Sequence, residues 1–309
     1  MKGGDVERKI VYEIGEQDAG GTVMQFLRGK RYSGQMIGAL KWSGDGITCN
    51  GRPVKMKARL QVGDRLMVYA HERERSEDIL QVELPFPVVY EDEDLVVVSK
   101  PAGMPVQPSW YYRDNSLANA AAFYYREQAE QFVYRCVTRL DKDTTGLVLL
   151  AKNPISSGIL YDLMANREIK RTYYAIARRE YERMLQTGEK GIIDLPIGKD
   201  MDAANVYKID RENGKQAVTH YEVLAGTEDY AYVKLHLETG RTHQIRVHME
   251  AMGYPLAGDE TYHGSKPDTV TGLHRQALHA GMLEFSHPIT GEWMRFEASL
   301  PKDMKDGLL

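Results

Sequence analysis

Cysteine is scarce in this chain of 309 residues, and its two cysteines, Cys49 and Cys136, form no CxxC pair. This excludes a disulfide framework, and we expect a reducing, cytoplasmic compartment. No apolar run approaches the roughly 18 residues of a membrane span, and residues 1–8 lack the apolar segment of a signal peptide. The chain also has no GxGxxG after a strand and no GxxxxGKS or GxxxxGKT loop, so the usual phosphate cradles of nucleotide cofactors are missing.

Charge is distributed unevenly along the chain, although the net charge is only −4. Residues 1–75 carry 14 Lys and Arg against 9 Asp and Glu, whereas the remaining residues carry 26 against 35. Between Arg28 and Arg59 there are eight basic side chains and one acid. This asymmetry indicates a basic module attached to an acidic body. A merely solvated basic face is the alternative.

The basic part has an ordered set of short elements. We expect helices at Val23–Leu27 and Ser33–Leu40, the second capped by Ser33. Asn50-Gly51 between β-prone runs predicts a type I′ hairpin turn, and Leu60–Val68 predicts another strand.

This order of elements resembles the S4 RNA-binding domain over residues 15–70. The resemblance implies contacts with the RNA backbone, because Lys and Arg bind phosphate and release counterions. The implied contact residues are Arg28, Lys30, Arg31, Lys41 and Arg52. We expect an RNA-binding domain at 1–75, a linker at 76–86 and a second domain at 87–305.

Strands and helices alternate in the second part without a regular βαβ rhythm. Val88–Tyr90 and Leu95–Val98 predict a hairpin, and Ser116 is a predicted cap for a helix over Leu117–Gln131. We expect a further helix at Ser156–Glu168 and strands at Thr172–Ala177, Ala217–Leu224, Tyr230–Glu238 and Trp293–Ala298. The prediction is an α+β fold with a mixed, largely antiparallel sheet.

The most informative segment places Arg139 two residues ahead of Asp141, just before the apolar stretch Leu147–Ala151. A carboxylate near a guanidinium at the edge of a core strand is a candidate reactive group. Three further clusters accompany it, namely the proline-rich Lys100–Ser109, Lys170–Ala175 and the donor-rich Thr239–Met249.

With these clusters assembled, residues 87–300 resemble the RluA-type pseudouridine synthases, which isomerise uridine in RNA. The resemblance rests on the ordered matches at Lys100–Ser109, Arg139–Leu147, Arg171–Tyr173, Pro196–Gly198, Gly214–Ala217, Gly240–His248, Gly258-Asp259, Leu278–Ala280 and His287-Pro288. An S4 domain ahead of this catalytic domain also occurs in the family.

The resemblance implies a role for each of three residues. Asp141 would be the nucleophile, and Arg246 would form the ion pair that keeps this carboxylate charged. Tyr173 would lie against the uracil and is the family's favoured candidate for handling the C5 proton, although a bare phenol is a poor base near neutral pH.

The resemblance also implies that Arg139 enters the RNA stack where the target nucleotide leaves it. We expect Arg241 to contact RNA, and Lys100 to bind RNA phosphate or backbone carbonyl groups rather than to act in catalysis. No metal and no organic cofactor are expected. The expected partner is RNA, with ribosomal RNA favoured and transfer RNA as the alternative, and the expected state is a monomer.

Two other functions compete with this interpretation. Asp141–Thr145 also fits DxDxT, the nucleophile motif of aspartyl-phosphate phosphatases, which require Mg²⁺. There the motif follows a continuous apolar strand, whereas here Arg135, Thr138 and Arg139 interrupt the preceding run. A non-catalytic RNA-binding protein is the third hypothesis, and the joint presence of Asp141, Tyr173 and Arg246 argues against it.

Chelation separates the two enzymatic hypotheses. We expect EDTA to leave pseudouridine formation unchanged, because an Asp nucleophile that breaks a glycosidic bond needs no metal ion. The measurement is pseudouridine formed in RNA with and without excess EDTA, with free Mg²⁺ restored as a control for RNA folding. Loss of activity that only Mg²⁺ restores, together with EDTA-sensitive phosphatase activity, would favour the phosphatase.

Overall fold

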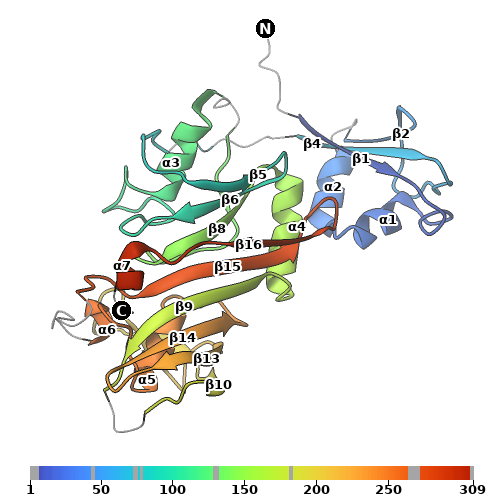
Figure 1. Ribbon diagram of the computed structural model, residues 1–309. Coiled ribbons are helices and arrows are strands. Elements are labelled where there is room, and N and C mark those ends of the chain that lie inside the picture. The colour runs from blue at the N-terminus through green and yellow to red at the C-terminus, as the bar shows by residue number, and fades with distance from the viewer. Residues whose placement is uncertain are drawn as a thin grey trace.

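Two sheets organise the computed structural model, which describes residues 7–42, 46–71, 76, 79–127, 132–180, 184–263 and 272–306. The smaller sheet contains β1 (Glu7–Glu13), β2 (Ile47–Cys49), β3 (Arg52–Pro53) and β4 (Arg65–His71), in the order β1-β4-β2-β3. It lies beside the larger sheet (Figure 1). No helix among the described residues is long and apolar enough to cross a membrane.

The smaller sheet carries α1 (Val23–Gly29) and α2 (Gly34–Trp42), close to the two predicted helices. The Ser33 hydroxyl accepts a hydrogen bond from Met36 N at 3.2 Å, as expected of a cap. Asn50 and Gly51 have φ values of 52° and 77°, which confirms the predicted hairpin turn. Sequence reasoning missed β1, whose alternation buries Ile10 and Tyr12 and exposes Val11.

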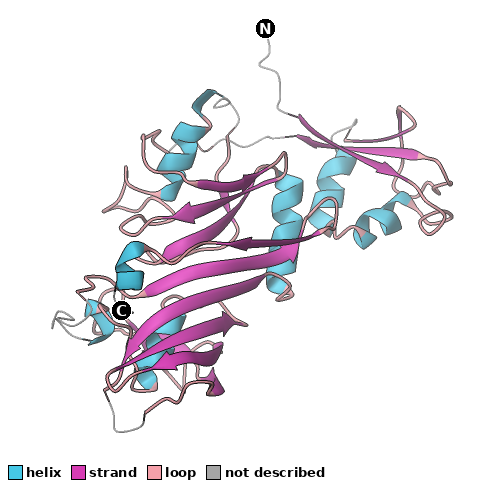
Figure 2. Ribbon diagram, viewed as in Figure 1, coloured by secondary structure: helices cyan, strands magenta, loops and turns pink. Residues whose placement is uncertain are grey.

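The larger sheet confirms the mixed, largely antiparallel α+β fold (Figure 2). Its strands are β5 (Val88–Glu91), β6 (Leu95–Lys100), β7 (Arg135–Cys136), β8 (Thr145–Ala151), β9 (Lys170–Arg178), β10 (Lys190–Asp194), β13 (Val218–Gly226), β14 (Tyr230–Leu237), β15 (Leu278–Ser286) and β16 (Trp293–Glu297). The order is β10-β13-β14-β9-β15-β8-β6-β5, with β16 beside β15 and β7 beside β8. Only the β8–β15 contact is parallel among the described pairings. A separate two-stranded sheet contains β11 (Ile197–Lys199) and β12 (Tyr207–Ile209).

The helices of this part differ from expectation at their ends. Ser116 caps α3 (Leu117–Tyr124) as predicted, but the helix ends well before the predicted limit, and Gln131 lies outside the described residues. Asn153 caps α4 (Pro154–Ala165), with Pro154 at its first turn, so this helix starts before the predicted Ser156. The remaining helices are α5 (Gln244–Ala251), α6 (Glu260–His263) and α7 (Lys302–Asp306).

One hydrophobic core runs from the smaller sheet into the larger one. Buried Leu27 and Val68 belong to the same cluster as Leu149 on β8 and Leu160 on α4. In the described part of the segment expected as a linker, Val82 N bonds to Asn119 O at 3.4 Å, so the chain lies against the body there. Burial of shared apolar surface therefore holds the basic part against the body.

A polar group at this junction joins β1 to the body. Arg8 on β1 donates to both carboxylate oxygens of buried Asp94, at 3.2 and 2.9 Å. The same carboxylate accepts from Asn153 and Ser156, each at 2.9 Å, at the start of α4. Such a fork on a buried carboxylate is a strong contact because both charges are satisfied.

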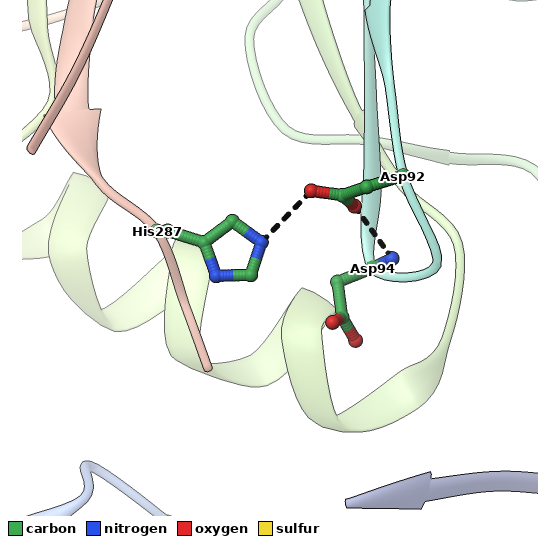
Figure 3. A group of neighbouring side chains, drawn as sticks. All are labelled: Asp92, Asp94 and His287. Carbon is green, nitrogen blue, oxygen red and sulfur yellow. Dashed lines mark hydrogen bonds and ion pairs between the residues drawn. The ribbon is translucent and has the colours of Figure 1, made fainter. Parts of the chain in front are cut away.

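Asp92, Asp94 and His287 lie close together (Figure 3), and they are residue types that bind metal ions. Their lone pairs, however, are already used by protein donors. Asp92 accepts from two backbone amides, from Tyr90 and from His287 Nε2, the last at 3.0 Å. His287 Nδ1 accepts from the amides of Ile289 and Thr290. The cluster therefore serves as a hydrogen-bonded junction rather than as a metal site.

Gly146 permits the contact between β8 and β15. Its φ is +111°, and a Cβ at this position would collide with the backbone of Ala280, its partner across the parallel pairing. Because Gly146 follows Asp141 by five residues at the start of β8, this approach also places the Asp141 loop next to β15.

We expect Gly146→Ala to lower the free energy of unfolding by about 3–5 kcal/mol, since it combines an unfavourable φ with a backbone clash. Gly188→Ala is the matched control, because its φ is +85° but no atom lies within 4 Å of the new methyl group. It should cost only about 1–2 kcal/mol. Urea denaturation measures both, and equal losses would contradict the role of the close approach.

Candidate active site

A cleft of about 1130 Å³ lies over the larger sheet, and its walls are basic although the second part of the chain is acidic overall. Asp141 and Glu238 are the acids among its described lining residues. Its basic lining residues are Arg139, Lys142, Arg167, Arg171, Lys199, Lys215, Arg241 and Arg246. An excess of cations in a concave site favours a polyanion there.

Asp141 lies in the loop between β7 and β8, at the base of the cleft. Its side chain is about a quarter exposed, so it is accessible from the cleft. The next residue, Lys142, is held in place because the buried Lys100 Nζ donates a hydrogen bond to its carbonyl oxygen at 2.8 Å. The same ammonium donates to Pro101 O and Met104 O, at 2.7 and 2.8 Å. Lys100 thus fastens the proline-rich loop to the Asp141 loop.

Arg246 projects from α5 and is buried. Its Nε and Nη2 donate to the two oxygens of Asp259, at 2.6 and 2.7 Å. Its remaining terminal nitrogen, Nη1, lies 3.6 Å from Asp141 Oδ2. The two-nitrogen bond of Arg246 to Asp259 therefore directs Nη1, its third nitrogen, at the Asp141 carboxylate.

Two aromatic side chains complete the surroundings of Arg246. Its guanidinium carbon lies 4.8 Å from the Tyr262 ring centroid, a cation–π contact. The Tyr262 hydroxyl accepts from Tyr207 N at 3.0 Å and is 2.9 Å from His243 Nδ1. Burial lowers the pKa of His243 below its usual value, which keeps this ring neutral at neutral pH beside the arginine.

Tyr173 on β9 faces the cleft from the sheet and is 4% exposed. Burial raises the pKa of its phenol, and the nearby Arg171 only partly offsets this. The phenol therefore stays protonated near neutral pH. In this state it presents a ring face and an O–H donor, not a base.

The structure brings five of the predicted residues to one cleft: Asp141, Tyr173, Arg246, Arg139 and Arg241. Arg139 is exposed, and Arg241 is held through Nε by Gln216 O at 3.0 Å. The predicted Arg246–Asp141 ion pair is present, but Asp259 is the nearer partner of Arg246. Arg28, Lys30, Lys41 and Arg52 are exposed on the smaller part, outside the residues that line the cleft.

One predicted RNA contact is corrected, in favour of the alternative that Lys100 binds backbone carbonyl groups. Lys100 is 1% exposed and all three of its N–H groups bond to carbonyl groups, so it cannot reach a phosphate. Burial also lowers its pKa to about 7. Arg31 pairs with Asp162 and Glu168, at 2.9 and 2.8 Å, across the junction of the two parts. Arg31 is itself exposed, so its contact with RNA stays a prediction.

Sequence reasoning missed the contacts of Asp259 and Tyr262 with Arg246, and it missed the helix α5. Gly258-Asp259 was seen as a motif, but nothing local pairs it with Arg246, 13 positions earlier. The position before α5 has no capping residue that would indicate the start of a helix. His243 precedes the helix with a φ of 55°, and its side chain makes no capping hydrogen bond. Gln244 instead anchors this turn through Thr239 and Thr219, at 2.8 and 3.0 Å.

We expect Asp259→Asn to lower the free energy of unfolding by about 3 kcal/mol, because it leaves a buried guanidinium with only the more distant Asp141 as its anion. Asp303→Asn is the matched control. Asp303 receives the same two-nitrogen fork from Arg275, at 2.7 and 2.9 Å, but is 44% exposed. It should cost less than about 1 kcal/mol in urea denaturation. A similar cost for both variants would refute the importance of burial.

Comparisons with known proteins agree with this geometry. The family model described as RNA pseudouridylate synthase matches residues 94–251. "Uncharacterized RNA pseudouridine synthase YjbO" of Bacillus subtilis is 38% identical over 92% of this chain and 96% of its own length. "Ribosomal large subunit pseudouridine synthase D" of Vibrio parahaemolyticus is 38% identical over 85% of this chain and 82% of its own.

Solved structures give the same answer for the fold. "Human RNA Pseudouridylate Synthase Domain Containing 4" superposes with a TM-score of 0.57 at 25% identity, over 72% of this chain and 91% of that chain. Matches of this length and identity across most of the sequence leave one assignment. The chain belongs to the RNA pseudouridine synthase family.

Proposed function

We propose that this enzyme converts uridine in ribosomal RNA into pseudouridine with Asp141 as its nucleophile. The observation that carries the proposal is that Asp141, Arg246 and Tyr173 line the same basic cleft. Pseudouridine formation is the activity of the family. The assignment of ribosomal RNA rests on relatives named for the large ribosomal subunit, such as the Vibrio parahaemolyticus protein.

The reaction is an isomerisation within one nucleotide. Attack by the Asp141 carboxylate on C1′ of the ribose forms an ester as the bond to N1 breaks, and the freed uracil turns within the cleft. C5 then bonds to C1′ as the ester bond breaks, which releases Asp141. C5 loses its proton and N1 gains one, so no group is donated. The role of Arg246 is to hold the Asp141 carboxylate in place through their ion pair, in which Nη1 and Oδ2 lie 3.6 Å apart.

Tyr173 would contact the flipped-out base, and Arg139 would fill the space that the base leaves in the RNA stack. The buried Tyr173 ring offers a flat surface for the uracil, and its raised pKa argues for a packing and hydrogen-bonding role in the resting state. Arg139 is exposed at the cleft, two residues before Asp141, and would enter the RNA stack. Flipping a base out of its stack costs about a few kcal/mol, which such an insertion would partly offset.

The basic part at residues 1–75 would dock the RNA backbone as an S4-like domain. Arg28, Lys30, Lys41 and Arg52 are its exposed candidates for phosphate contacts. Because the shared core and the Arg8–Asp94 pair hold this part against the body, the docked RNA would have a fixed approach to the cleft. We further propose a monomer that works in the cytoplasm, where ribosomal RNA is found.

The test is pseudouridine mapping in total RNA from cells that contain the enzyme only as a variant. Asp141→Asn should reduce product at least about a thousandfold while RNA binding stays nearly intact, because the nucleophile is lost and the cleft is not. Asp143→Asn is the matched control. Asp143 accepts a hydrogen bond from Gly103 N but does not line the cleft, so its change should alter product by less than about threefold.

The same pair of variants separates the competing interpretations. In the DxDxT phosphatase, the second aspartate would matter as much as the first, so equal loss in both variants would contradict our assignment. Wild-type product from Asp141→Asn would show that another group is the nucleophile. The mapped position names the target uridine, and a site in transfer RNA would overturn the ribosomal assignment.

A further inference from the structure

The loop between β6 and α3 presents two adjacent aromatic side chains to solvent. Trp110 is 78% exposed and Tyr111 is 85% exposed. Large aromatic groups bury far more surface than most residues when they find a partner, so exposing two together is costly unless they bind something.

This aromatic tip is held in a defined shape. Ser109 and Tyr112 exchange two backbone hydrogen bonds, both 3.1 Å, so Trp110 and Tyr111 are the two central residues of a tight hairpin turn. Below the turn, Asn115 Nδ2 donates to Gly103 O at 3.2 Å. A fixed turn lowers the entropy that the side chains lose when they bind.

Cations surround the aromatic rings. The Arg113 guanidinium lies 4.4 Å from the Trp110 ring centroid. Lys142 Nζ lies 5.3 Å from the Tyr112 ring and 3.3 Å from its hydroxyl. Aromatic faces interleaved with Arg and Lys favour a ligand with both flat rings and negative charge.

The tip is also adjacent to the active site. Pro105, Val106, Gln107 and Pro108 line the cleft, and Trp110 follows two residues after this wall. Lys142, which contacts Tyr112, directly follows Asp141. A strand of RNA whose uridine enters the cleft would therefore pass close to the aromatic tip.

We propose that Trp110 and Tyr111 form a stacking platform for unpaired RNA bases next to the target uridine. This inference rests on the proposed function in taking RNA as the ligand, and it adds that the substrate is single-stranded beside the modified position. Exposed aromatic rings stack on any base, while Arg113 and Lys142 bind the neighbouring backbone. Bases within a duplex are stacked on each other and would not reach the platform.

The experiment measures binding of fluorescein-labelled oligouridylate and of a duplex RNA of equal length by fluorescence anisotropy. We expect Trp110→Ala to weaken binding of oligouridylate at least about fivefold and to leave duplex binding unchanged. Trp110→Phe should retain most of the affinity, because it keeps an aromatic face. The phenylalanine variant separates loss of stacking from disturbance of the loop.

Trp293→Ala is the matched control. Trp293 is 55% exposed and has Lys170 Nζ 5.5 Å above its ring. Arg171 and Tyr173 line the cleft, and they lie one and three positions after Lys170 on β9. Side chains alternate between the two faces of a strand, so Lys170 and the Trp293 ring beside it lie on the face away from the cleft. Replacement of Trp293 should leave oligouridylate affinity unchanged.

Unchanged oligouridylate affinity in Trp110→Ala would overturn the proposal and leave a protein as the partner of the tip. Equal weakening on duplex RNA, or in Trp293→Ala, would also overturn it, because base stacking would not be the cause. The proposed function fails separately. If the wild-type enzyme forms no pseudouridine but its oligouridylate binding still depends on Trp110, the platform stands without it.

Discussion

The buried ion pair between Arg246 and Asp259 is the interaction on which the active site depends. A guanidinium in this position would be too costly to bury alone, and Asp259 satisfies two of its nitrogens at 2.6 and 2.7 Å. The pair fixes the direction of the third nitrogen, which points at Asp141. Tyr262 covers the guanidinium face, so the arginine keeps one orientation. The proposed nucleophile, Asp141, thus has a cation beside it that does not move away.

A few specific contacts also fix the backbone around Asp141. Lys100 holds two loops together through three carbonyl groups, and Gly146 lets β8 approach β15. Charge is arranged on a larger scale. An acidic body carries a basic cleft, and a basic part is held beside it by Arg8 and Asp94. A polyanion would meet cations along one path and carboxylates elsewhere, which favours entry at the cleft.

Local signals predicted much of the fold because their causes are local. Ser33 and Ser116 cap helices through their own hydroxyl groups, and Asn50-Gly51 forms its turn because both positions need a positive φ. Helix ends were less predictable, since α4 starts at the Asn153–Pro154 cap rather than at Ser156. The helix α5 was missed because the Gln244 network stabilises it, not its own propensity. The strand β1 was missed although its alternation at Ile10–Tyr12 is a local signal for a strand.

The sequence by itself determined which residues are candidates for the site, because Asp141, Arg139, Tyr173 and Arg246 each belong to a short ordered motif. Only the tertiary structure decided how these side chains pair. Arg246 bonds first to Asp259, Lys100 turns inward to carbonyl groups, and Arg31 bonds to the body. The physical reason is that a charge bonds to the nearest uncompensated opposite charge or dipole in three dimensions. Which partner is nearest depends on how distant strands and helices are packed, and no local motif records it.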